Sequence, residues 1–328
     1  MSYVVYRISL ERSTTIIPIY DIRYTEYDIR NTKYELTQHL NLTEYFSLMR
    51  EHSFLALGPN GFHRVVYSDF GDPDNPRVLI CVHGLTRNGR DFDTLAEALC
   101  DHYRVICPDV PGRGRSDWLS VKQDYGYPLY CADMAALIAH LDVEAVHWVG
   151  TSMGGLIGML LAAQPGTPVK RLVMNDVGPL IPKEALQRIV SYVGDDPEFD
   201  SMRGVEAYIR EIYSPFGPLT DAQWRNLVEC SARVIADGEY GLNYDPGISE
   251  PLRMMPAEDV DLWPMWDKVS CPVLLIRGET SDVLLAETAT EMQRRGPKIE
   301  FIELKGMGHA PTLMPENQIA IVRNWLLR

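Results

Sequence analysis

Residues 146–163 read VHWVGTSMGGLIGMLLAA, and this segment decides the fold. Its first four residues form a short apolar run typical of a buried strand, and its last nine are typical of a packed helix. Between them lies a G-x-S-x-G pentapeptide, Gly150 to Gly154. Glycines let the strand and the helix approach closely around a sharp turn, so the hydroxyl of Ser152 should project from that turn. The first turn of the helix offers unpaired N–H groups, which suit an oxyanion that develops beside the serine.

A carboxylate and a histidine follow the serine in the chain order that a nucleophile on such a turn needs. The apolar run 273–277 predicts a strand that leads into a polar turn with Asp282. The run 299–304 predicts another strand, followed by a glycine-rich loop around His309. All three side chains therefore come just after strands, at the edge where open parallel sheets build their sites. Serine needs a base to take its proton and the base needs a carboxylate to fix its tautomer, so we predict a triad of Ser152, Asp282 and His309.

With His83-Gly84 after an earlier apolar run, these features resemble the α/β-hydrolase superfamily of serine hydrolases over roughly residues 60–328. In that superfamily the loop after the His-Gly pair supplies one oxyanion N–H, and the residue after the nucleophile supplies the other. The resemblance therefore implies an oxyanion hole made by the backbone N–H groups of Leu85 and Met153. It gives His83 the role of ordering the oxyanion loop. The loop here is shorter than the HGGG form of some lipases.

Two other acids compete with Asp282 for the place beside the histidine. Asp176 follows the predicted strand 171–175, which comes directly after the strand that delivers Ser152. Some members of the superfamily place the triad acid there. Glu279 lies in the same turn as Asp282. We expect Asp282, with Asp176 as the main alternative.

The rest of the chain predicts an α/β fold with a mostly parallel central sheet and helices on both faces. From about residue 60, strand patterns alternate with helix patterns, as crossover connections in a parallel sheet require. The alternation stops over residues 180–266, where helical pieces carry many large aromatic side chains. We expect this stretch to be an inserted helical cap above Ser152 that excludes water and shapes the pocket. Residues 49–179 and 267–328 then form the hydrolase core.

Residues 1–48 do not fit this pattern. They contain a near repeat with a period of seven residues, which begins at Tyr20-Asp21-Ile22-Arg23 and again at Tyr27-Asp28-Ile29-Arg30. The spacing of Tyr and Ile gives no coiled-coil seam. We expect an atypical, dispensable extension that begins at an upstream start codon; the alternative is an arm that packs on the body or on a partner.

Composition excludes several classes of function. The 31 Lys and Arg residues against 45 Asp and Glu residues give a net charge of −14, which disfavours nucleic acids and anionic membrane surfaces as partners. No apolar run is long enough for a membrane span. The six cysteines suit a protein core in a reducing cytoplasm. The sequence has no Walker A loop, no G-x-G-x-x-G and no H-E-x-x-H, so we expect no nucleotide cofactor and no metal. The oligomeric state stays open.

The predicted function is hydrolytic acyl transfer on a small molecule. A serine nucleophile disfavours the dehalogenases and epoxide hydrolases of the superfamily, which use an aspartate at that position. A carboxylic ester or a lactone is the first expectation, and a carbon–carbon bond of a ring-cleavage diketone is the second. A thioesterase and a hydrolase of oligomeric hydroxyesters stay open. The alternative outside enzymes is a hydrolase-fold receptor for a small molecule.

Overall fold

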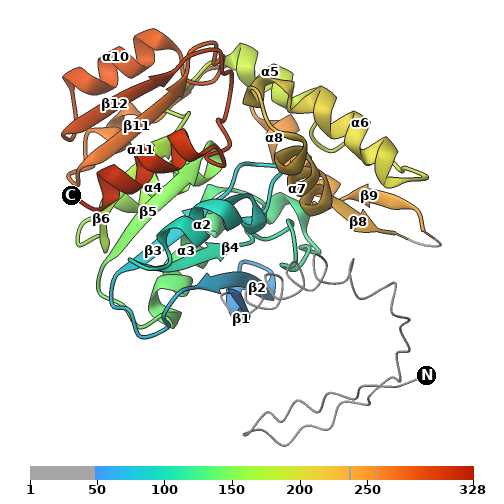
Figure 1. The fold of residues 1–328 in the computed structure, drawn as a ribbon, viewed down its shortest axis with the longest axis horizontal. Coiled ribbons are helices and arrows are strands. Elements are labelled where there is room, and N and C mark those ends of the chain that lie inside the picture. Colours follow the sequence, from blue (N-terminus) through green and yellow to red (C-terminus); the bar gives the residue numbers. More distant parts are fainter. Residues whose placement is uncertain (1–48, 236–237, 257) are drawn as a thin grey trace, which may run out of the picture. The chain divides into compact units, whose positions relative to one another are not determined.

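The computed structural model describes residues 49–328 except 236, 237 and 257, so the predicted extension 1–48 lies outside the described residues. Its centre is an eight-stranded sheet with the order β1-β2-β4-β3-β5-β6-β11-β12 (Figure 1). The pairings from β4 to β12 are all parallel, and only β1–β2 and β2–β4 are antiparallel. The prediction of a mostly parallel sheet is therefore confirmed. The strands are β1 Met49–Gly58, β2 Gly61–Phe70, β3 Val78–Val82, β4 Arg104–Pro108, β5 Val146–Thr151, β6 Val169–Asn175, β11 Val273–Gly278 and β12 Ile299–Leu304.

Helices cover both faces of this sheet, as its strand sequences require. Strand side chains alternate between faces, and both faces of β3 are fully buried. Val78, Ile80 and Val82 pack in the apolar core that includes side chains of α3, α4 and α10, whereas Leu79 and Cys81 pack in the core beneath α2 and α11. The helices are α2 Asp93–Leu99, α3 Tyr127–His140, α4 Met153–Ala162, α10 Ala286–Arg294 and α11 Glu316–Leu326, with 3-10 turns η1 Gly89–Phe92 and η2 Lys122–Asp124.

Strand β1 is the one strand of the large sheet that the sequence patterns do not predict. It pairs with β2 over its whole length, from Met49 opposite Phe70 to Gly58 opposite Gly61. Most of its side chains are exposed or only partly buried, including Leu55 and Leu57. A strand at the edge of a sheet lacks the continuous apolar run that marks the central strands, and this explains the omission.

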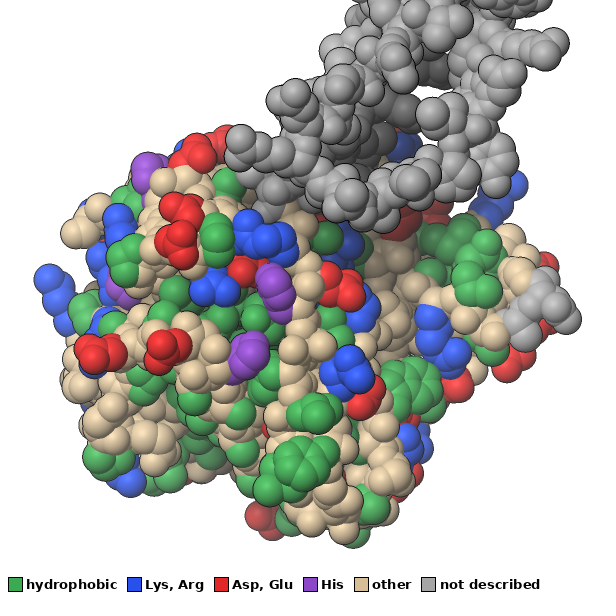
Figure 2. Space-filling model, turned by 90° about the horizontal axis from the view of Figure 1, so that it is seen from below, with side chains coloured by type: hydrophobic (Ala, Val, Ile, Leu, Met, Phe, Trp, Pro, Cys, Tyr) green, Lys and Arg blue, Asp and Glu red, His purple; other side chains and the backbone are tan. Residues whose placement is uncertain are grey.

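The side of the molecule that carries β1 and β2 is seen in Figure 2. Acidic and basic side chains of the described residues are interspersed there with apolar ones. Among the residues that the structure describes, every helix is too short or too polar to cross a lipid bilayer.

Residues 180–266 leave the sheet after β6 and return before β11. Short antiparallel strands, β7 Leu180–Ile181 and β10 Val260–Asp261, pair at the base of this inserted segment. Its helices α5, α6, α7 and α8 lie together beside the core (Figure 1). The remaining elements are α5 Lys183–Val190, α6 Met202–Ile212, η3 Ser214–Phe216, α7 Asp221–Ser231, β8 Ala232–Val234, β9 Tyr240–Leu242, η4 Pro246–Ile248, α8 Ser249–Met254 and α9 Trp263–Trp266.

Candidate active site

Ser152 lies on a strained turn between β5 and α4. Its backbone has φ 50° and ψ −114°, a conformation that residues with a side chain rarely adopt. A Cβ atom on Gly150 would lie 2.2 Å from the carbonyl oxygen of Gly154, and one on Gly154 would lie 2.0 Å from the carbonyl oxygen of Val82. Only glycine fits at both positions. The pentapeptide thus has the form expected of a nucleophile turn.

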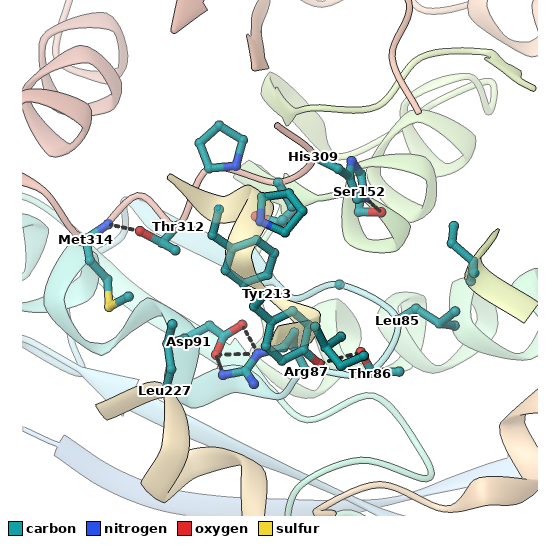
Figure 3. Close-up of a pocket in the computed structure, with 18 of the residues that line it drawn as sticks. Leu85, Thr86, Arg87, Asp91, Ser152, Tyr213, Leu227, His309, Thr312 and Met314 are labelled. Atoms are coloured by element: carbon teal, nitrogen blue, oxygen red, sulfur yellow. Dashed lines mark hydrogen bonds and ion pairs between the residues drawn. The ribbon is translucent and has the colours of Figure 1, made fainter. Parts of the chain in front are cut away.

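His309 reaches the serine from the loop after β12. Its Nε2 lies 2.9 Å from Ser152 Oγ, and the two side chains lie directly beside each other (Figure 3). Glycines again allow the approach: a Cβ on Gly278 at the end of β11 would lie 2.0 Å from the carbonyl oxygen of Gly308. The backbone N–H of Gly308 also donates to the carbonyl of Pro215, which joins this loop to the inserted segment. The structure therefore brings Ser152 and His309 together, although 157 residues separate them.

The acid beside His309 is Asp176, not Asp282. His309 Nδ1 lies 2.8 Å from Asp176 Oδ2, and the Asp176 side chain is fully buried. Its carboxylate also accepts hydrogen bonds from the N–H of Gly278 at 2.7 Å, the N–H of Ala310 at 3.1 Å and the hydroxyl of Ser281 at 2.6 Å. These donors fix its orientation toward the imidazole. The expectation that Asp282 contacts the histidine is wrong, and the alternative acid occupies that place.

Asp282 lies one residue beyond the point where this turn touches the site. Its carboxylate forms a two-pronged ion pair with Arg188 of the inserted segment, with Nη2 to Oδ1 at 2.9 Å, and both side chains are exposed. The turn after β11 contributes the hydroxyl of Ser281 to Asp176 instead. Glu279 accepts a hydrogen bond from the N–H of Gly306 and has no contact with the histidine among its hydrogen bonds.

The predicted oxyanion loop is held by His83, which is fully buried. The N–H of Val110 donates to His83 Nε2 at 2.9 Å, so the ring proton is on Nδ1, which lies 2.7 Å from the carbonyl oxygen of Gly84. That carbonyl belongs to the same peptide group as the N–H of Leu85. Since the two point in opposite directions across a trans peptide, His83 fixes the direction of this N–H. Burial lowers the pKa of His83 to about 4, which keeps the ring neutral.

Arg113, to which the sequence patterns assign no role, contacts both residues that are expected to supply the oxyanion N–H groups. Its guanidinium is fully buried and donates from Nε to the carbonyl of Leu85 at 2.8 Å. Nη1 donates to the carbonyl of Pro111 and to the hydroxyl of Tyr130, and Nη2 lies 3.8 Å from the sulfur of Met153. Met153 is the first residue of α4, where a backbone N–H has no partner within the helix.

A cleft of about 800 Å³, counted with its open mouth, lies over Ser152 and His309. The core supplies the loop from Gly84 to Arg87 and the loop from His309 to Thr312, and the inserted segment supplies Arg188, Ile189, Tyr192, Ile212, Tyr213, Pro215, Phe216 and Leu227. Of the large aromatic side chains in residues 180–266, Tyr192, Tyr213 and Phe216 line the cleft, whereas Trp224, Tyr240, Tyr244, Trp263 and Trp266 do not.

Within residues 49–235, 238–256 and 258–328, no three His, Cys, Asp or Glu side chains are grouped so that they could hold a metal ion. A hydroxyl beside an imidazole that is backed by a buried carboxylate can act as a nucleophile toward a carbonyl carbon.

Known proteins are similar to this chain in sequence and in fold. A 3-hydroxybutyrate-oligomer hydrolase of Cupriavidus necator is 48% identical over 274 residues, which cover 81% of this chain and 94% of that protein. A putative hydrolase from Rickettsia typhi superposes with a TM-score of 0.79 and 33% identity over 85% of this chain and 98% of that one. An α/β hydrolase from Novosphingobium aromaticivorans superposes with a TM-score of 0.76 and 36% identity over the same shares of each chain.

The sequence profile of the alpha/beta hydrolase family matches residues 79–321, which include all the residues of the site described above. The predicted fold class and the prediction of an enzyme that hydrolyses carboxylic esters are confirmed at the level of the family. The chain belongs to the α/β hydrolase family.

Proposed function

We propose that this enzyme hydrolyses the ester bonds of short 3-hydroxyacid oligomers through an acyl-enzyme on Ser152. The observation that carries the proposal is the contact series Ser152–His309–Asp176 inside the cleft. The substrate class is supported by the 48% identical relative, which is a 3-hydroxybutyrate-oligomer hydrolase and is matched over 94% of its length. A small ester of apolar acyl units also suits a cleft whose lining includes the aliphatic and aromatic side chains of Ile189, Ile212 and Phe216.

In the proposed mechanism, His309 Nε2 takes the proton of Ser152 Oγ as the oxygen attacks the ester carbonyl carbon. Asp176 accepts the Nδ1–H hydrogen bond and stabilises the imidazolium that forms. The N–H groups of Leu85 and Met153 hold the oxyanion, each worth on the order of 3 kcal/mol in the transition state. The C–O bond then breaks, His309 protonates the departing alcohol, and water releases the acyl group by the same steps.

The inserted segment acts as the cap of this site in the proposal. Thr86 in the oxyanion loop and Tyr213 in the segment share a hydrogen bond of 2.8 Å between their hydroxyls, which closes the cleft on one side (Figure 3). Closure removes water from the oxyanion and strengthens the electrostatic contacts there. We also propose the cytoplasm as the compartment, because all six cysteines are free thiols.

The test is product analysis by chromatography with the purified full chain. We expect dimers and trimers of 3-hydroxybutyrate to yield monomer, and Ser152→Ala to abolish this while the protein stays folded. A fluorophosphonate probe should label the native enzyme and not the variant. Monomer release by Ser152→Ala at the native rate would refute the mechanism. Hydrolysis of simple p-nitrophenyl esters with none of the oligomers would refute the substrate class alone.

A further inference from the structure

Among the described residues that line the cleft, the two arginines differ in the place of their charge partners. Arg87 is buried and forms an ion pair with Asp91, with Nε 2.9 Å from Oδ2. Both residues line the cleft, so the two charges of this pair cancel for a ligand in the cleft. Arg188 also lines the cleft, but its partner Asp282 is not among the lining residues. The Asp282 carboxylate therefore approaches the guanidinium from outside. The cleft wall thus carries a guanidinium whose counter-charge, Asp282, lies outside the lining.

The pair is also of a kind that a ligand can rearrange. The Arg188 and Asp282 side chains are 41% and 47% exposed. Exposed ion pairs of this type contribute only about 0–1 kcal/mol. A guanidinium has five N–H donors in a planar fork. Asp282 accepts from two of them, and the Tyr192 side chain shares a further hydrogen bond with Arg188. A second carboxylate can therefore share Arg188 or replace Asp282 at little cost.

Arg188 is connected through its ion pair to the part of the site that holds His309. Asp282 is adjacent in the chain to Ser281, which donates to Asp176, which in turn holds His309. The oxyanion loop with Leu85 and Thr86 is instead tied to Arg113 and Tyr213. Because His309 protonates the leaving oxygen, the alcohol portion of an ester lies beside the histidine.

We propose that Arg188 binds the free carboxylate of the substrate and so selects esters whose alcohol portion ends in a carboxylate. This rests on the proposed function, and it specifies which ester bond is cut. In a 3-hydroxyacid oligomer, four covalent bonds separate the last ester carbonyl carbon from the terminal carboxylate carbon. With that carboxylate on Arg188, the last ester lies at Ser152. The Ser152 Oγ–acyl bond forms, the C–O bond to the terminal 3-hydroxyacid breaks, and its oxygen takes the proton from His309. The enzyme thus releases monomers from the carboxylate end.

The test compares the 3-hydroxybutyrate dimer with the same dimer whose terminal carboxylate is a neutral carboxamide. We expect the native enzyme to prefer the acid in kcat/KM by roughly 10- to 100-fold, the range of a charge-assisted contact. Arg188→Gln should reduce this ratio to near one, mainly through KM of the acid, and Arg188→Lys should keep part of it. Arg295→Gln, which breaks an ion pair of similar exposure with Asp267, is the matched control and should leave the ratio unchanged.

The variant Asp282→Asn distinguishes two roles of the ion pair: binding of a ligand by Arg188, and attachment of the inserted segment to the core. It breaks the same ion pair but leaves the cation, so the proposal expects the acid-to-amide ratio to stay or to rise. If Arg188→Gln and Asp282→Asn instead lower kcat/KM equally for both dimers, the pair is only a tether and the proposal is overturned.

A second readout keeps this inference separate from the proposed function. The dimer acid should inhibit hydrolysis of p-nitrophenyl butyrate competitively and far better than the carboxamide, and Arg188→Gln should remove the difference. If the dimers are not cleaved but this inhibition pattern holds, the substrate class fails and the carboxylate site stands. Equal inhibition by acid and amide in the native enzyme would overturn the carboxylate site.

Discussion

At the scale of single residues, backbone conformation determines which acid lies beside His309. Asp176 has φ 60°, Ser152 has φ 50° and Ala310, next to His309, has φ 64°. These left-handed conformations at non-glycine residues cost energy and persist only where the surrounding structure enforces them. Here they turn three loops toward one point.

Replacing each of the two candidate acids by asparagine, in separate variants, tests which of them supports His309. Asp176→Asn should lower kcat by roughly 10³- to 10⁴-fold, because the amide no longer holds the imidazole in the correct tautomer. Asp282→Asn should cost less than about tenfold on a neutral ester such as p-nitrophenyl butyrate. Steady-state kinetics on both variants, with circular dichroism to confirm folding, decides between them. A larger loss from Asp282→Asn than from Asp176→Asn would contradict the geometry.

The sequence could identify Ser152 and His309, because Ser152 lies in a G-x-S-x-G turn after a strand and His309 follows it in a glycine-rich loop after a later strand. His83 also follows a strand, but it precedes the serine. It could not choose the acid. Both Asp176 and Asp282 follow strands of the sheet, and β6 and β11 are neighbours in it. Which carboxylate meets the histidine depends on the path of the loops after these strands, and that path is set by backbone contacts rather than by residue type.

At the scale of elements, the central strands could be predicted because both of their faces are buried, and continuous apolar runs follow from that. Strand β1 could not, since most of its side chains face solvent. The place of the inserted segment in the chain could be predicted, because the alternation of strand and helix patterns stops there. Its pocket-lining residues were not separable from its structural aromatics, because both groups are apolar and only the docking of α5 and α6 distinguishes them.

The junction of β5 and α4 offers a test at this scale. Gly154→Ala would place a Cβ atom 2.0 Å from the carbonyl oxygen of Val82, which cannot move without distorting β3. We expect loss of activity and a drop in unfolding free energy of several kcal/mol, comparable with overpacking of a core. Gly204→Ala in α6 is the control: its nearest neighbour would be a Phe199 side-chain atom at 3.4 Å, an ordinary contact.

For Gly204→Ala we expect a change of less than about 1 kcal/mol, toward greater stability, because alanine favours helices over glycine. Urea denaturation followed by circular dichroism measures both variants. A Gly154→Ala protein with native stability would contradict the close approach of strand and helix.

For the whole molecule, the buried imidazole of His83 links stability to pH. Burial holds its pKa at about 4 in the folded state, against about 6.5 when unfolded. The fold therefore favours the neutral ring. This contribution is complete above pH 6.5 and is lost as the pH falls from 6.5 to 4, because only the unfolded chain then binds the proton. The loss amounts to about 3 kcal/mol.

Unfolding free energies measured in urea between pH 7 and pH 4 should show this decline, and His83→Gln should make it shallower by about that amount. His147 is the comparison. Burial also lowers its pKa to about 4, but its ring is partly exposed, so His147→Gln should have a smaller effect. An identical slope for His83→Gln and the native protein would show that protonation of this ring does not limit acid stability.

His309 comes from a loop that lies 133 positions beyond Asp176 and 157 positions beyond Ser152, and the sheet brings these distant parts of the chain together. Neither half of the polypeptide can carry any turnover by itself. The catalytic rate of a sample is consequently proportional to the fraction of molecules with an intact sheet. Thermal inactivation should therefore coincide with the unfolding of the strands rather than with the fraying of surface helices.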